Sequence, residues 1–142
     1  MKRILLLLAT LASLLTMTAQ SRSQWANEML ETKHKFIIEQ VGLTPAQQQQ
    51  FMPLYEAMEK EIFQTNRDAR SLARNVEKKK NPSDADYMQA AEALSNAKVR
   101  EGEIEAKYFA KFTKILSKRQ LFLLKKAEND FARNMLQGRK KK

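Results

Sequence analysis

Two five-residue stretches, LTPAQ at residues 43–47 and LSKRQ at residues 116–120, share the pattern Leu-(Ser/Thr)-x-x-Gln. Thr44 has the side chain of a helix N-cap, and Pro45 would occupy the first helical position, where a missing N–H costs nothing. Gln47, three residues after the cap, can return a hydrogen bond to the Thr44 backbone and close a capping box. The first stretch therefore predicts a helix that begins at Pro45.

The second stretch repeats this arrangement, with Ser117 as the N-cap and Gln120 as the residue that closes the box. Leu43 and Leu116 precede the two caps, where an apolar side chain can pack onto the helix that follows. A single motif of this kind is common as a plain helix start. Each copy alone therefore predicts a sharp helix N-terminus and nothing more.

The rest of the chain is predicted to be helical, because Gly and Pro are few and the apolar residues recur every three or four positions. We expect helices over residues 24–41, 45–79 and 118–137. Gly42 should end the first of these and Gly138 the last. Pro53 lies inside the second helix and predicts a bend. The third helix should begin at Asn81-Pro82, or at Ser83 with Asp86, and end at Leu116. Its expected inward residues are Tyr87, Ala91, Leu94, Ile104, Tyr108, Phe112 and Ile115.

The predicted helices are of unequal length. Two of them have about 33 to 35 residues and would reach about 50 Å each, roughly twice the length of the other two. A compact four-helix bundle needs more even lengths. We therefore predict an all-α fold in which four helices form an extended, curved layer, completed by a homodimer that buries the remaining apolar rows.

The N-terminus has the pattern of a secretory signal peptide. Lys2 and Arg3 precede an apolar run over residues 4–15, and small residues lead to Ala19. This run is shorter than the roughly 20 apolar residues that cross a bilayer as a helix. We expect export with cleavage between Ala19 and Gln20. The predicted layout is a signal peptide at 1–19, a helical domain at 20–137 and a basic disordered tail at 138–142.

The basic charge is concentrated near the C-terminus. The formal charge of +10 falls to +8 once Lys2 and Arg3 are removed, and residues 116–142 carry +7 of it, from nine basic and two acidic side chains. Phe122 lies off the expected inward row of this helix and has cations on both sides. Such a face could attract unfolded or acidic polypeptides, or Phe122 could pack on a dimer partner above a solvated lysine face. The candidate client-binding residues are Lys118, Arg119, Phe122, Lys125, Lys126 and Arg133.

Catalytic and metal-binding patterns are weak in this sequence. It has no Cys and a single His, His34, whose i, i+3 partner Glu31 makes one pair and not a site. Glu103 and Glu105 are two positions apart and would face different ways on a helix. We expect no catalytic residues, no cofactor, no metal and no enzyme activity. Export disfavours nucleic acid as a partner, whereas membrane-surface contact through the basic tail stays open.

Taken together, the signal peptide, the helical pattern and the two motifs in this order make the chain resemble the Spy/CpxP family of periplasmic proteins over residues 24–137. The resemblance implies a periplasmic, cradle-shaped antiparallel dimer with ATP-independent chaperone activity on unfolded or aggregation-prone polypeptides. The alternative it implies is a regulator that docks on an envelope stress sensor. Metal-sensing members use several His and Met ligands, and this chain departs from them by having one His.

Overall fold

The structure, a computed structural model, describes residues 24–140 as four helices without a strand. A helix over residues 24–41 precedes α2 (Pro45–Glu77), α3 (Asp84–Phe112) and α4 (Lys118–Lys140). This confirms the predicted all-α class. The predicted signal peptide and its cleavage position at Ala19 and Gln20 lie outside the described residues. No helix over residues 24–140 is both long and apolar enough to cross a bilayer.

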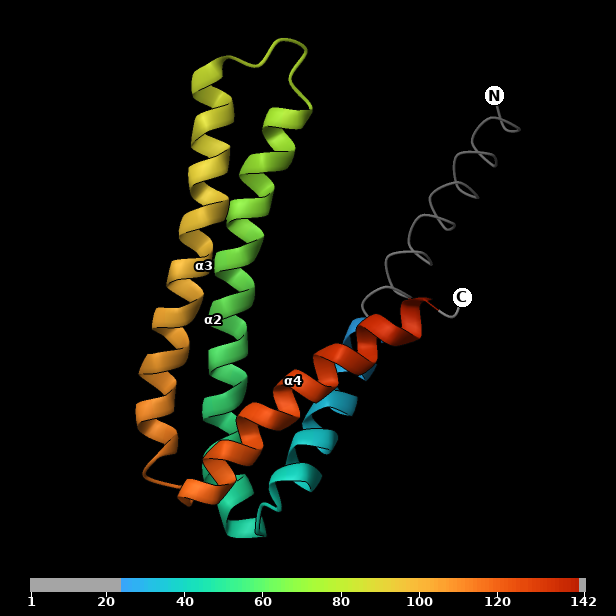
Figure 1. The fold of residues 1–142 in the computed structure, drawn as a ribbon, viewed down its shortest axis with the longest axis vertical. Coiled ribbons are helices and arrows are strands. Elements are labelled where there is room, and N and C mark those ends of the chain that lie inside the picture. The colour runs from blue at the N-terminus through green and yellow to red at the C-terminus, as the bar shows by residue number, and fades with distance from the viewer. Residues whose placement is uncertain (1–23, 141–142) are drawn as a thin grey trace, which may run out of the picture. The chain divides into compact units, whose positions relative to one another are not determined.

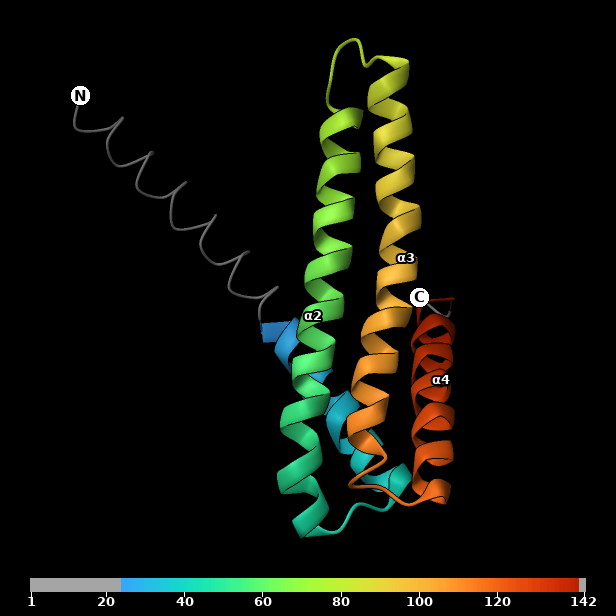
Figure 2. The same cartoon turned by 90° about the vertical axis from the view of Figure 1, so that its left-hand side faces the viewer.

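The chain divides into two compact units. Residues 43–122 form the hairpin unit, and the described residues 24–42 and 123–140 belong to the terminal unit. In the hairpin unit α2 and α3 run antiparallel and side by side (Figures 1 and 2). In the terminal unit Phe36 packs against Phe131 of α4, with ring centroids 5.8 Å apart. Ile37 and Leu124 of this unit are fully buried.

The two Leu-(Ser/Thr)-x-x-Gln motifs meet in the hairpin unit through their glutamines. Each glutamine Oε1 accepts a hydrogen bond from the backbone N–H of its own cap, Thr44 for Gln47 at 3.1 Å and Ser117 for Gln120 at 3.0 Å. Each Nε2 then donates to the Oε1 of the other glutamine at 2.9 Å. Gln47 Nε2 also donates to the Ile115 carbonyl at 3.1 Å. The two copies of the motif therefore meet as one reciprocal amide pair.

Helix starts follow the predicted caps closely. The Thr44 and Ser83 side chains both accept from the residue three positions on, and both capping boxes are complete. Pro45 is at the first helical position, and α2 continues without a break through Pro53. Gly42 ends the first helix with φ +66° and donates to the Ile38 carbonyl, as predicted for a left-handed cap.

Two predicted helix ends are wrong. Helix α3 ends at Phe112, four residues before Leu116, because Ile115 and Leu116 both donate to the Phe112 carbonyl and tighten the chain into a turn. The turn places Ser117 at the N-cap position of α4, where its hydroxyl accepts from the Gln120 N–H. Helix α4 continues to Lys140, so Gly138 does not stop it. A glycine inside a helix costs only about 1 kcal/mol and need not end it.

The predicted inward row of α3 is wrong in its first half. Tyr87, Ala91 and Leu94 are exposed, and the residues that face α2 there are Ala90 and Ala97. Small side chains thus face α2 along this stretch, and the larger apolar residues Tyr87 and Leu94 turn outward. From Tyr108 onward the prediction holds: Tyr108 and Phe112 are buried.

An aromatic cluster forms the core near the motif end of the hairpin unit. Phe51 and Tyr55 of α2 are fully buried, and their rings lie 5.3 Å apart. Phe112 of α3 packs on both, with ring centroids 4.7 Å from Phe51 and 6.3 Å from Tyr55. Tyr108 extends the cluster by one turn. Apolar burial therefore concentrates beside the paired glutamines.

Polar contacts align the rest of α2 with α3. Tyr108 Oη donates to Glu61 Oε1 at 2.7 Å, and Lys107 forms an ion pair with the same carboxylate. Hydrogen bonds from Lys107 and then Tyr108 lower the pKa of Glu61, and the bond to Glu61 raises the pKa of Tyr108. Farther along, Asn66 donates to Glu101 at 3.2 Å. These contacts fix the register of the two helices where apolar packing is thin.

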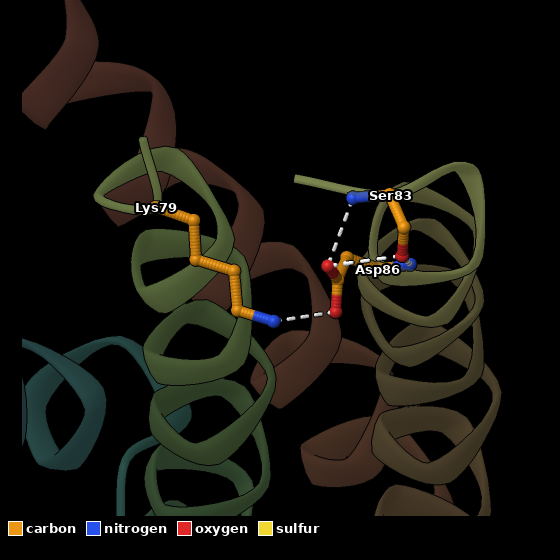
Figure 3. A network of polar contacts seen from close by, with 3 residues as sticks. All are labelled: Lys79, Ser83 and Asp86. Carbon is orange, nitrogen blue, oxygen red and sulfur yellow. Dashed lines mark hydrogen bonds and ion pairs between the residues drawn. The ribbon is translucent and has the colours of Figure 1, made fainter. Parts of the chain in front are cut away.

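The loop between α2 and α3 is closed by a small polar network (Figure 3). Asp86 accepts from the Ser83 backbone N–H at 2.9 Å and from the Ser83 hydroxyl at 3.0 Å. Lys79 forms an ion pair with the other Asp86 oxygen at 2.6 Å. The hydrogen bond from Lys79, followed by those from Ser83, lowers the pKa of Asp86 to about 2. One carboxylate thus joins the end of α2 to the start of α3.

This network predicts a pH-dependent contribution to stability. Because the pKa of Asp86 is lower in the folded chain than its ordinary value of 3.8, its contribution is present above about pH 4 and is lost as pH falls toward 2. Wild type should be more stable than Asp86→Asn at pH 5, and the difference should narrow steadily toward pH 2. Urea unfolding followed by circular dichroism measures it. Asp84→Asn is the matched control, and a difference that stays constant with pH would contradict the assignment.

Candidate functional site

The face predicted on α4 contains an exposed aromatic residue. Phe122 is 68% exposed, whereas Leu121 and Leu124 on the neighbouring row are buried. Lys118 and Arg119, one turn before Phe122 on the same helix, are also exposed. The sequence therefore assigned the inward and outward rows of α4 correctly, and an apolar ring beside two cations faces solvent.

Ion pairs engage the other predicted cations of α4. Lys125 pairs with Glu128 at 3.0 Å, and Lys126 and Arg133 both pair with Asp130, at 2.6 and 3.3 Å. The hydrogen bond from Lys126 is the main cause of the lowered pKa of Asp130. Half of the six predicted client-binding residues are therefore paired along the helix. Lys118 and Arg119 have no carboxylate within ion-pair distance among the described residues.

Several large apolar side chains of α3 are exposed among polar ones. They are Tyr87, Met88, Leu94, Val99 and Phe109, from 36% to 61% exposed. Single exposed apolar residues are ordinary on protein surfaces, but several on one helix mark a contact surface. Because the first three follow one another within two turns, this face could pack against another helix or against an extended apolar segment.

A second basic face, on α2, was not predicted. Lys60, Phe63, Arg67, Arg70, Arg74 and Lys78 follow one another at spacings of three or four residues, and all six are exposed. We call this set the α2 basic row. The charge count missed it because residues 20–77 sum to −1, seven basic against eight acidic. Its helical spacing, with an apolar residue at Phe63, was the signal that could have revealed it.

A cavity of about 360 Å³ lies between α2 and α3. Its lining includes the buried alanines Ala69 of α2 and Ala97 of α3. Gln64 at its rim is committed to both oxygens of Asp68, at 3.0 and 3.1 Å. The cavity could receive an apolar side chain, with polar groups around it. Its lining residues are Gln64, Thr65, Asp68, Ala69, Leu72, Ala93, Asn96, Ala97 and Arg100.

The described residues show no group of three or more His, Asp or Glu side chains that could hold a metal ion. His34 is half-buried in the first helix, and Glu31 on the same helix is exposed. Glu103 is exposed and Glu105 is half-buried, so the two carboxylates lie in different surroundings. That the protein needs no metal and catalyses no reaction stays a prediction.

Comparison of the chain with family models, with curated proteins and with solved structures finds no match. The resemblance to the Spy/CpxP family therefore rests on the motifs, their order and the N-terminal pattern.

Proposed function

We propose that the protein is an ATP-independent periplasmic chaperone that binds unfolded or aggregation-prone polypeptides on α4. The observation that carries this proposal is Phe122, which is 68% exposed beside the cations Lys118 and Arg119. An exposed cation accelerates the approach of an acidic or unfolded chain, and an exposed ring can then bury one of its apolar side chains. A positive charge and an exposed ring on one helical turn suit the transient capture of an unfolded client.

Weak binding is what this function needs. A protein that binds unfolded clients tightly lowers their stability by mass action, so a chaperone without nucleotide should bind weakly and release quickly. One ring among charged side chains meets this condition better than a broad apolar patch would. The proposal includes a cradle-shaped antiparallel dimer, which the exposed apolar residues of α3, Tyr87 and Leu94 among them, could support.

Client capture on α4 can be tested by separating approach from release. Lys118→Glu with Arg119→Glu should slow association with an unfolded client about tenfold at low salt and flatten its salt dependence. Phe122→Ser should instead speed release about tenfold, because burying a phenylalanine contributes roughly 1.5–3 kcal/mol. Stopped-flow binding and light scattering of an aggregating client, without nucleotide, measure both effects.

Leu136→Ser is the matched control for the aromatic change, because Leu136 is 63% exposed on the same helix. All variants must keep the helicity and mass of wild type. If both α4 variants suppress aggregation as well as wild type does, α4 is not the client surface. If wild type itself suppresses nothing but binds the acidic ectodomain of a stress sensor, the regulator alternative replaces the chaperone.

A further inference from the structure

The α2 basic row is a straight line of positive charge with one aromatic residue near its start. From Lys60 to Lys78 it covers 19 residues, and the 18 steps between the two ends make about 27 Å at roughly 1.5 Å per residue. Phe63 is 65% exposed and lies one turn after Lys60. Five members lie at helical spacing on α2, and Lys78 is its C-cap residue with helical backbone angles, so the five cations and the ring face the same way.

The cations of this row are largely uncompensated. Arg67 contacts Asp68 at 3.6 Å, with both side chains more than half exposed, and Arg70 is one of the weaker causes of the lowered pKa of Glu101. Lys60, Arg74 and Lys78 have no carboxylate within ion-pair distance among residues 24–140. On the predicted α4 face Lys125, Lys126 and Arg133 are paired, and Lys118 and Arg119 are the two cations without an ion pair among the described residues. The α2 basic row therefore has more unpaired cations than the α4 face.

We infer that the α2 basic row docks the protein on an anionic phospholipid surface. Arginine guanidinium groups match phosphate oxygens in a two-point geometry, and three of the five cations are arginines. An anionic leaflet attracts each basic residue near it, and an aromatic ring can lie among the headgroups beside them. In this pose α2 lies along the surface and Phe63 enters the headgroup layer.

A lipid surface fits the row better than a peptide or a nucleic acid does. The exposed neighbours of the row are the polar Gln64, Ser71 and Asn75 and the carboxylates Asp68 and Glu77, and the cavity between α2 and α3 is lined by none of the six row residues. The row therefore lacks a groove for peptide side chains. The export predicted from residues 1–19 brings the chain to membrane surfaces and away from nucleic acid.

Vesicle binding tests this inference. The protein is purified after export, with its N-terminus verified by sequencing, and is sedimented with vesicles of phosphatidylcholine alone or mixed with phosphatidylglycerol. Wild type should bind the mixed vesicles at low salt and dissociate at high salt. Arg67→Gln with Arg70→Gln and Arg74→Gln should reduce partitioning on the order of a hundredfold, since each lost cation removes its share of the attraction.

The matched control removes three positive charges elsewhere, Lys118→Gln with Arg119→Gln and Lys126→Gln, and should change partitioning by only a few-fold. A second readout uses Trp25→Phe with Phe63→Trp, whose single tryptophan should shift to shorter wavelength on the mixed vesicles. Equal binding to both vesicle types would overturn the inference. A loss of vesicle binding seen only in the α4 control, or only when residues 139–142 are removed, would also overturn it. Tighter binding to polyglutamate or to duplex DNA than to vesicles would do the same. Client binding on α4 is measured in a separate experiment. Failure of the vesicle prediction and failure of the proposed chaperone function can therefore be told apart.

Discussion

Phe112→Ala should destabilise the protein by about 3–5 kcal/mol, the cost of removing a buried aromatic side chain from a packed core. Phe112 is 2% exposed and contacts the rings of Phe51, Tyr55 and Tyr108. Alanine would leave a cavity between α2 and α3 beside the paired glutamines. Urea unfolding followed by circular dichroism gives the change in the free energy of unfolding.

The control for this prediction is Phe63→Ala, the same substitution at a residue that is 65% exposed in the same unit. It should change stability by no more than about 0.5 kcal/mol. A loss under 1 kcal/mol for Phe112→Ala, or equal losses for the two variants, would show that the aromatic cluster is not the core of the hairpin unit.

Gln47→Ala should cost about 2–3 kcal/mol. The substitution removes the box contact to Thr44 and leaves the Gln120 amide and the Ile115 carbonyl without the partner that both have in the wild type, and an unsatisfied polar group costs roughly 1–3 kcal/mol. The same unfolding measurement gives this value.

Gln47→Glu is the more specific variant, because it keeps the capping box and changes the hydrogen bonds to Gln120 and Ile115. A carboxylate can still accept the hydrogen bond of the Thr44 N–H, so the capping box survives. It cannot donate to Gln120 or to the Ile115 carbonyl, so of the reciprocal pair only the bond donated by Gln120 Nε2 remains. We expect Gln47→Glu to be destabilised by at least half as much as Gln47→Ala. A stability equal to that of wild type would mean that the glutamine acts as a cap alone.

Local chemistry made some of these features predictable from sequence. The starts of α2 and α4 follow from Thr44 and Ser117, because a cap is decided by residues within one turn. The pairing of Gln47 with Gln120 did not follow, since it joins residues 73 positions apart and depends on how α3 returns the chain. The repetition of the motif in the sequence was a sign of this pairing. That the two glutamines hydrogen-bond each other became clear from the structure.

Two features that the sequence left ambiguous, the buried face of α3 and the charged surface rows, became clear from the packing of the helices. In α3 the larger side chains Tyr87 and Leu94 suggested the inward row, yet the residues buried against α2 there are Ala90 and Ala97. On the surface, summing charge over segments concealed the α2 basic row, because the acidic side chains of residues 20–77 cancel its cations in the sum. Spacing along each helix, and not segment charge, locates such faces.

The two motifs act as a pair, and a double-mutant cycle of Gln47→Ala and Gln120→Ala tests this claim. The cycle compares the free energies of unfolding of wild type, both single variants and the double variant. Because the two side chains hydrogen-bond each other in both directions at 2.9 Å, we predict a coupling energy of about 1–2 kcal/mol. Losses that add within about 0.3 kcal/mol would contradict the claim and leave two independent helix caps.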